Sequence, residues 1–282
     1  MKNRRDFLRL TATGVASAAL IPGDMLIRAN KPGEGEKIKD TFSLGMAGYS
    51  FYNLSFEQAL VIMKRINVLN MSLKDNYLPL SSEKVKIEEV TGRFRAAGIN
   101  IYTVGVITME KEEDVDRAFA YASAAGVKMI VGQPAPALVS YVEEKVKQYD
   151  IRIAMHNHGP DTKNFPTADI IWDRIKSLDR RMGICLDIGH TTRAGRDAVA
   201  DLIKYAPRIY DIHIKDVTGS TKEGRTIEMG RGVIDIPAFV KALRKVKYSG
   251  MCSLEFEKDM DDPLGGIAES IGYLRGVCAS LR

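Results

Sequence analysis

The chain has 282 residues, of which 45% are hydrophobic and 27% are charged, a balance that excludes a wholly disordered or collagen-like protein. Its formal charge of +5 is concentrated at the N-terminus, because removing residues 1–22 leaves 37 basic against 35 acidic side chains, or +2. The rest of the chain is nearly neutral, which argues against nucleic acid as the main partner, since binding to a duplex normally needs a clustered basic face.

The first residues have the composition of an export signal. Arg4 and Arg5 precede Phe7-Leu8 and a short apolar run at 10–21, which Pro22 and Gly23 end. The paired arginines resemble the twin-arginine type of signal. The alternative is an amphipathic N-terminal helix, but the run lacks a polar face and, at about 12 residues, is too short to span a bilayer, as is every later stretch. We therefore expect residues 1–23 to be a signal and the protein to be periplasmic or otherwise exported.

The rest of the chain is predicted to be one domain after a linker. Residues 24–40 are polar and rich in Lys, Gly and Glu, which is typical of a linker. From residue 41, apolar runs that indicate strands alternate with amphipathic segments that indicate helices. The predicted strands lie at 42–49, 68–73, 99–106, 128–131, 151–156, 183–188, 209–214 and 251–256, and the predicted helices at 55–65, 83–97, 112–125, 137–149, 167–177, 198–205, 237–246 and 264–281.

Eight strand–helix units in about 240 residues indicate the fold class. Strands that alternate with helices of 10–15 residues imply parallel βαβ units, and eight of them at this length favour a closed barrel over an open doubly wound sheet. We predict an α/β protein with a single (β/α)8 TIM barrel over residues 41–282. Neither GxGxxG after the first strand nor GxxxxGK[ST] occurs, so a nucleotide cofactor is not expected.

The cysteines do not indicate a disulfide scaffold. Cys185, Cys252 and Cys278 form no CxxC pair, and their number is odd. A Cys inside an apolar run behaves as a small hydrophobe, so we expect all three in the core.

Polar side chains gather at the ends of four successive predicted strands. All four histidines of the chain fall between residues 156 and 213. In a barrel the carboxyl ends of the strands converge on one face, so residues far apart in the sequence become neighbours there. The residues at these ends are His156 and His158, then Asp187 and His190, then His213, Lys215 and Asp216, and finally Glu255.

This composition is typical of a metal site. Imidazoles and carboxylates supply nitrogen and oxygen ligands for one divalent ion such as Mn, Co, Zn or Fe, while the absence of a thiolate at these strand ends argues against a structural zinc site. The alternative is a set of buried, hydrogen-bonded polar residues without a ligand. Charged groups at corresponding places on four strands favour the metal, because a packed core avoids unpaired carboxylates.

At these residues the chain resembles the xylose-isomerase-like barrel superfamily, in particular its sugar phosphate isomerases and epimerases, which include tagatose epimerases and inosose dehydratases. The resemblance covers about residues 41–282 and implies that His156, Asp187, His213 and Glu255 bind one divalent metal. The motifs that carry it are Asp187-Ile188-Gly189-His190, His213-Ile214-Lys215-Asp216, Ser253-Leu254-Glu255-Phe256-Glu257 and Gly230-Arg231-Gly232-Val233-Ile234-Asp235.

One motif departs from the pattern of the family. Its epimerases carry Glu-Asn-His where this chain has His156-Asn157-His158. Epimerases move a proton between two faces of a carbon with two carboxylates, while the metal stabilises the enediolate. With His156 in place of Glu the pair is broken, which favours isomerisation or β-elimination. His156 is then either a ligand or a base, because imidazole in general titrates between about pH 5 and 8. His158 is the alternative base, and Glu255 is a ligand and a candidate second proton carrier.

The expected substrate is a small carbohydrate. His190 and Lys215 are predicted to contact it, and Lys74 and Arg231 are weaker candidates. The leading hypothesis is an exported, metal-dependent sugar isomerase or epimerase-like enzyme, and the nearest rival is a lyase or dehydratase that acts on a keto-sugar or keto-glycoside. A metal-dependent endonuclease would need more ligands and a basic groove. The non-enzymatic alternative is a periplasmic carbohydrate-binding protein. The oligomeric state is left open, a homo-oligomer included.

Overall fold

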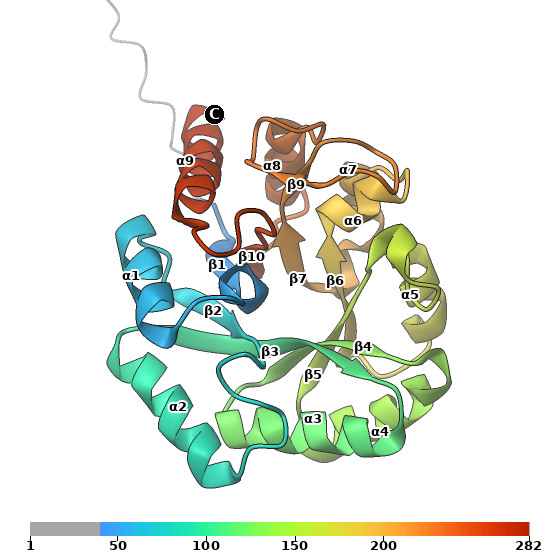
Figure 1. The fold of residues 1–282 in the computed structure, drawn as a ribbon. Coiled ribbons are helices and arrows are strands. Elements are labelled where there is room, and N and C mark those ends of the chain that lie inside the picture. Colours follow the sequence, from blue (N-terminus) through green and yellow to red (C-terminus); the bar gives the residue numbers. More distant parts are fainter. Residues whose placement is uncertain (1–39, 282) are drawn as a thin grey trace, which may run out of the picture. The chain divides into compact units, whose positions relative to one another are not determined.

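The computed structural model describes residues 40–281 (Figure 1). The predicted signal at 1–23, and the predicted linker up to residue 39, lie outside the described residues. Asp40, the last residue of the predicted linker, pairs with Arg244 at 2.6 Å.

The strands form a closed parallel barrel, as predicted. Around the barrel the order is β1, β10, β7, β6, β5, β4, β3, β2, so every neighbour is also a neighbour in the order of the strand–helix units. The barrel strands are β1 (Ser43–Ala47), β2 (Asn70–Leu73), β3 (Asn100–Met109), β4 (Met129–Pro134), β5 (Arg152–His156), β6 (Met182–Asp187), β7 (Ile209–Ile214) and β10 (Met251–Leu254).

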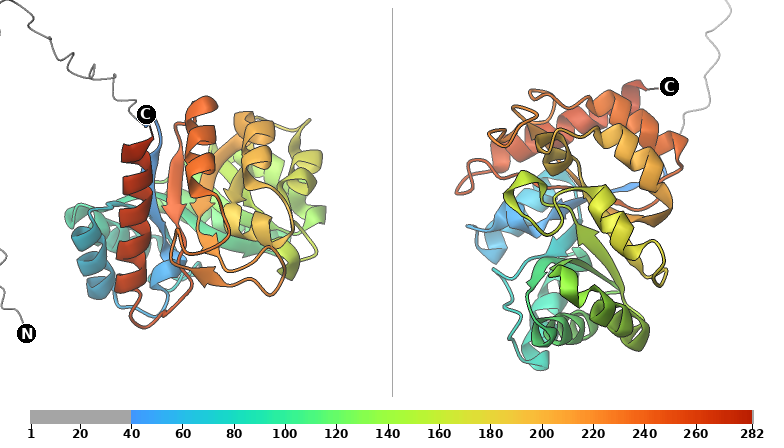
Figure 2. Two further views of the ribbon diagram at one scale, coloured as in Figure 1. Left: turned by 90° about the horizontal axis from the view of Figure 1, so that it is seen from above. Right: turned by 90° about the vertical axis from the view of Figure 1, so that its right-hand side faces the viewer.

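The helices surround the strands (Figure 2). One long helix lies between each strand and the next, and the last follows β10, which confirms the single (β/α)8 TIM barrel. These helices are α1 (Phe56–Ile66), α2 (Lys84–Ala96), α3 (Glu112–Ala125), α4 (Val139–Tyr149), α5 (Ala168–Ile175), α7 (Ala198–Tyr205), α8 (Ile236–Lys245) and α9 (Leu264–Ser280).

The local sequence explains where helix α1 begins and which of its faces packs against the barrel. Helix α1 begins after a capping box, in which the Ser55 side chain accepts from Gln58 N–H and the Gln58 side chain accepts from Ser55 N–H. Its buried residues Ala59, Ile62, Met63 and Ile66 recur at helical spacing and face the barrel.

Several short elements were not predicted. Helix α6 (Ile188–Arg193) follows β6 directly, and a small antiparallel ribbon of β8 (Asp216–Val217) and β9 (Thr226–Ile227) follows β7. Short 3-10 turns lie at Gly48–Phe51, Pro136–Leu138, Gly159–Asp161 and Ala206–Arg208. Most of these additions lie at the carboxyl ends of strands, the end of a barrel that carries active sites.

The core contains two of the three cysteines. Cys185 and Cys252 are buried, whereas Cys278 is half-buried against the core, so the expectation that all three lie inside is wrong for Cys278. It lies in the last turns of α9, where one side of the helix faces solvent.

Among residues 40–281, no helix combines the length and the apolar character needed to cross a membrane.

Candidate metal centre

Strands β5, β6, β7 and β10 are neighbours in the barrel and bring the predicted ligands together. Asp187 and His213 are direct partners in the register of β6 and β7, and Glu255 N–H donates to the carbonyl of Ile214 just beyond them. Side chains of a strand alternate between two faces. His156, Asp187, His213 and Glu255 therefore point into the same end of the barrel, and all four are buried.

The distances within this set suit one metal ion. His156 Nε2 lies 3.5 Å from Asp187 Oδ2, and His213 Nδ1 lies 3.9 Å from Asp187 Oδ2 and 3.3 Å from Glu255 Oε2. One ligand atom from each of the four residues lies within 4.8 Å of all the others. Ligand bonds of about 2.1 Å in a tetrahedral site place the ligands about 3.4 Å apart. The four side chains thus have nearly the spacing of a metal's ligand shell.

The hydrogen bonds of these side chains are incomplete without an ion. Both ring nitrogens of His156 and both of His213 are buried and have no hydrogen-bond partner among residues 40–281, and Asp187 Oδ2 has none besides its ion pair with Lys215. Buried polar atoms are almost always paired, because an unpaired one costs about 1–3 kcal/mol. One nitrogen from each imidazole and one oxygen each from Asp187 and Glu255 come together in this set, and such buried donors fit a bound cation.

The charged side chains around the four proposed ligands also suit a bound cation. The Lys215 ammonium, 1% exposed, lies 3.1 Å from Asp187 Oδ2, 2.6 Å from Glu255 Oε2 and 2.5 Å from Glu257 Oε1. Glu257 is exposed, so the two buried carboxylates and the ammonium leave a charge of −1, which a protonated His213 balances in the metal-free protein. A divalent cation could take the place of that proton, whereas an uncompensated buried charge is costly.

The shifts in pKa put three of the four ligands, all but His213, in the forms that bind a metal. Burial alone would raise the pKa values of Asp187 and Glu255, but Lys215 and the nearby histidines hold both well below their usual range. Burial lowers the pKa of His156 to about 4, so its imidazole is neutral at pH 7. For His213 burial acts in the same direction, but Cys185 and Glu255 outweigh it and raise its pKa well above the usual value. A metal would displace that proton.

The carboxylate of Asp187 is positioned by the helix that follows it, α6. Its Oδ1 accepts a hydrogen bond from His190 N–H at 2.7 Å and caps the N-terminus of α6, which leaves Oδ2 for the metal centre. This bond comes from a backbone N–H, so it explains the position of the Asp187 carboxylate and not the identity of the residue at 190. The sequence analysis did not single out Asn157, which is fully buried and bonds to the backbone of Asp187.

His158 and His190 lie beside the metal centre. Their rings are 4.6 Å apart and nearly perpendicular, and His158 is 5.5 Å from the ring of His156. Arg193, which pairs with Asp161 at 2.7 Å, lies 3.3 Å from Nδ1 of His190. Because a guanidinium can only donate, Nδ1 accepts and the hydrogen of the neutral ring is assigned to Nε2. Burial keeps His190 neutral, since it holds the pKa well below the usual value.

A cavity of about 310 Å³ opens beside these groups. Lys215, predicted as a substrate contact, lies at its inner wall and is buried among carboxylates rather than solvated. Glu257, which lies two residues after Glu255 and so faces the same side of the chain, was missed as a site residue, although the period of a strand gives this signal. The lining residues include His190, Arg193, Lys215, Arg225, Glu257 and Lys258.

Two weaker candidates are placed elsewhere. Lys74 donates to the carbonyl of Val106 at 3.0 Å and pairs with Asp75 at 2.9 Å, in a separate cavity of about 150 Å³ at the ends of β2 and β3. The side chain of Arg231 is 58% exposed and makes two hydrogen bonds of 2.6 Å to Glu269 on α9. In this structure neither side chain contacts the metal centre.

Asp216 has a structural position at the rim. Its buried carboxylate accepts hydrogen bonds from the backbone N–H groups of Val217, Gly230, Gly232 and Ile234, at 2.9–3.1 Å. These bonds hold the loop that contains the Gly230–Asp235 motif. A Cβ on Gly232 would lie 2.1 Å from Asp216 Oδ1, so this close approach requires glycine.

Comparison with known proteins identifies curated relatives of part of the chain. The chain is 30% identical over 132 residues to the rhizopine catabolism protein MocC of Rhizobium meliloti, with 41% of this chain and 40% of that protein covered. It is 30% identical over 146 residues to an inosose dehydratase of Klebsiella pneumoniae, with 44% and 48% covered. The matches thus span less than half the length of these curated relatives.

The fold also matches solved structures. The crystal structure of the protein IolI with a zinc atom has a TM-score of 0.66 at 16% identity and covers 84% of this chain and 96% of that one. At this identity the likeness concerns the fold alone. The family model described as "Xylose isomerase-like TIM barrel" matches residues 70–277, most of the described barrel. The chain therefore belongs to the xylose isomerase-like TIM barrel family.

Proposed function

We propose that the protein is a divalent-metal-dependent enzyme that removes a proton from the carbon next to the carbonyl group of a sugar or cyclic polyol, and that loss of water follows. The observation that carries the proposal is the buried set of His156, Asp187, His213 and Glu255, whose four ligand atoms lie within 4.8 Å of one another and whose imidazole nitrogens have no hydrogen-bond partner among residues 40–281. The names of the curated relatives support dehydration, since five of the seven matches are inosose dehydratases and an inosose is a cyclic polyol ketone.

A divalent ion held by these four residues would polarise the carbonyl oxygen and make the neighbouring C–H bond more acidic. Two protein groups face the cavity where that oxygen would lie. Lys215 brings a positive charge, because its carboxylate neighbours outweigh burial and raise its pKa well above the usual value. His190 brings a neutral Nε2–H donor. Both would stabilise negative charge that develops on the oxygen.

His158 is the proposed base. His156 and His213 are buried members of the proposed ligand set, and Nδ1 of His190 is occupied by Arg193. His158 is the one remaining imidazole of the chain's four, and it is half-buried beside His190. In elimination its nitrogen takes the proton from carbon, a carbon–carbon double bond forms, and the neighbouring C–O bond breaks as the same proton passes to the leaving hydroxyl, which departs as water.

Isomerisation is the second candidate, and the one-sided placement of His158 favours it as well. The same base would return the proton to the former carbonyl carbon on the same face. Inversion at one carbon needs a second proton carrier on the opposite face. With a neutral His156 where an epimerase has Glu, Glu255 is the remaining candidate, and it is paired with Lys215.

The test is incubation of the metal-loaded protein with inososes and keto-sugars in D2O. Dehydration gives a conjugated enone that absorbs in the ultraviolet and water as a product, whereas isomerisation gives deuterium in a saturated product. His158→Gln should keep the metal and lower either rate about 10²–10⁴-fold. If sugars bind but neither exchange nor product is seen, the carbohydrate-binding alternative replaces the enzyme.

We also propose that the protein is exported by a twin-arginine pathway, on the evidence of Arg4, Arg5 and the short apolar run that follows. Such a pathway carries folded proteins and would suit a chain that takes up its metal before export. The test is cell fractionation of the natural chain beside the variant in which Arg4 and Arg5 are both Lys. Equal export of the two would contradict the proposal.

A further inference from the structure

We propose that His156, Cys185 and His213 form a second metal site, deeper in the barrel, that takes thiophilic divalent ions such as Zn²⁺ or Cd²⁺ through a thiolate. It shares both imidazoles with the metal centre described above, so the inference rests on the proposed function for those two ligands. The new element is Cys185, which the sequence analysis assigned to the core.

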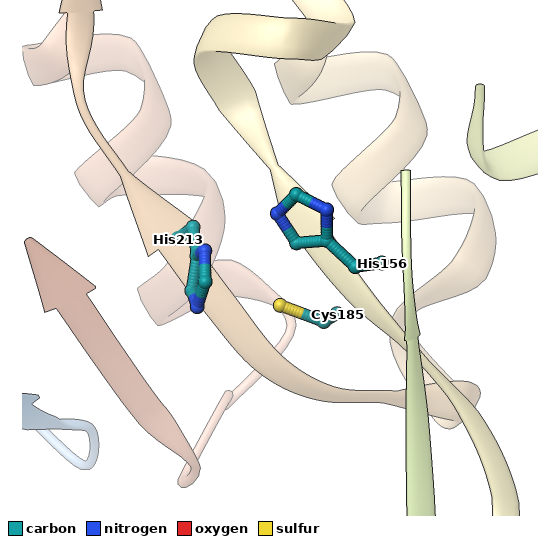
Figure 3. A group of neighbouring side chains, drawn as sticks. All are labelled: His156, Cys185 and His213. Atoms are coloured by element: carbon teal, nitrogen blue, oxygen red, sulfur yellow. The ribbon is translucent and has the colours of Figure 1, made fainter. Parts of the chain in front are cut away.

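The strand geometry places Cys185 below the metal centre. On β6 it precedes Asp187 by two residues, so its side chain points into the same barrel interior about 6–7 Å closer to the other end. In the register of β5 and β6 it is the direct partner of His156. The sulfur lies between the two imidazoles (Figure 3), and Sγ and one nitrogen from each ring lie within 4.8 Å of one another.

Each of the two imidazoles has a second ring nitrogen that can bind another ion. Each has two ring nitrogens, and none of the four has a hydrogen-bond partner among residues 40–281. His156 is 2% exposed, His213 is 1% exposed and Cys185 is fully buried. One nitrogen of each ring lies within 4.8 Å of the buried thiol, so Cys185 has two buried imidazoles without hydrogen-bond partners beside it and is not an isolated cysteine in the core.

Ligand chemistry predicts which ions would take which set. Carboxylates suit hard ions such as Mn²⁺ and Mg²⁺, whereas a thiolate suits softer ions, and zinc accepts two imidazoles and one thiolate. Binding at Cys185 forms one metal–sulfur bond and releases the thiol proton to solvent. An ion held there would lie away from Lys215 and the cavity, so we expect thiophilic ions to inhibit an enzyme that works with a hard ion.

The test uses metal-free full-length protein titrated with Cd²⁺ and separately with Mn²⁺. Sulfur-to-cadmium charge transfer absorbs in the ultraviolet and reports the thiolate directly. We expect this band on binding of Cd²⁺, and its loss in Cys185→Ser together with a more than about tenfold weaker affinity for Cd²⁺. Binding of Mn²⁺, followed by the spin resonance of the free ion, should change less than about threefold in the same variant.

Cys252 offers a matched control. It is equally buried, on β10, and belongs to none of the ligand sets among the described residues, so Cys252→Ser should keep the cadmium band. Cys185→Ala, checked by near-ultraviolet circular dichroism, replaces the serine variant if that one does not fold. A wild-type protein that binds Cd²⁺ without the band, or a band that survives in both Cys185 variants, would overturn the inference.

The outcome also separates this inference from the proposed function. Asp187→Asn combined with Glu255→Gln removes the carboxylates of the upper site and leaves the deeper set intact. The double variant should lose Mn²⁺ and keep the cadmium band. Binding of Mn²⁺ without any sulfur band in the wild type leaves the proposed function standing and refutes the deeper site. Failure of the wild type to bind either ion removes both.

Discussion

Asn157 is bonded to both backbone groups of Asp187. Its Oδ1 accepts from Asp187 N–H at 2.9 Å, and its Nδ2 donates to the Asp187 carbonyl at 3.2 Å and to Thr191 Oγ1 at 3.1 Å. Because side chains alternate along an extended chain, Asn157 faces away from the barrel interior, toward which His156 and His158 point. It thereby fixes the ends of β5 and β6 to each other, and with them two of the proposed metal ligands.

Replacing Asn157 should weaken metal binding without removing a ligand. Asn157→Ala is expected to lower the affinity for the bound divalent ion by about 10–100-fold, the usual cost of losing a group that orients a ligand. The measurement is competition with a chelating dye. Asn70→Ala is the matched control, since Asn70 also donates to a backbone carbonyl, that of Leu44, but at the other end of the barrel. Equal losses in the two variants would contradict the role given to Asn157.

The ligand assignment predicts loss of metal from two single variants. His213→Ala and Asp187→Ala each remove a ligand, so about one metal per chain should be lost, as measured by elemental analysis for Mn, Co, Fe and Zn. His158→Gln serves as the control, because His158 lies beside the centre and is not among its ligands. Full retention of metal in either ligand variant would show that the ion is bound elsewhere.

The metal-free protein should lose stability as the pH rises from about 4 to about 7, because of Asp211. Burial raises the pKa of this carboxyl group to about 7, against about 4 in an unfolded chain. The folded state therefore keeps a proton that the unfolded state loses. The contribution is fully present below about pH 4 and falls with rising pH until about pH 7, by an amount on the order of 4 kcal/mol.

Asp211→Asn isolates this contribution, since an amide does not titrate. Urea unfolding at pH 5 and pH 8 should show that the wild type loses more stability between the two than the variant does. Asp173→Asn, at a position whose side chain is 67% exposed, should behave like the wild type. Parallel pH profiles of the wild type and Asp211→Asn would refute the shift.

Gly232 should be intolerant of a side chain. A Cβ there would lie 2.1 Å from Asp216 Oδ1 and 2.4 Å from the carbonyl of Val217, so the loop bonds to Asp216 would have to break. We expect Gly232→Ala to lower the free energy of unfolding by about 2 kcal/mol or more. Gly219→Ala, in the neighbouring loop between β8 and β9, meets nothing within 4 Å and should change it by less than about 0.5 kcal/mol. Similar values for the two glycines would refute the packing argument.

Local signals in the sequence were sufficient for most of the fold. Helices α3 and α7 and strand β7 have the predicted bounds, because their ends depend on nearby residues: Gly126 ends α3 with a positive φ of 73°, and the Asp197 side chain caps α7. Helix α6 was missed for the opposite reason. Its six residues include Gly189 and two threonines, poor helix formers, and its cap is Asp187, which the sequence pattern assigned to a strand.

The sequence by itself determined the barrel and the identity of the residues that gather at its carboxyl end, since hydrophobic periodicity and parallel topology are properties of the chain pattern. The tertiary structure decided which of them touch. The register of β5 with β6 placed Asn157 on Asp187 and Cys185 beside His156. Because β7 packs against β10, Lys215 lies among three carboxylates. Contacts of this kind depend on register and on buried charge balance between segments distant in the sequence, for which no local pattern provides a signal.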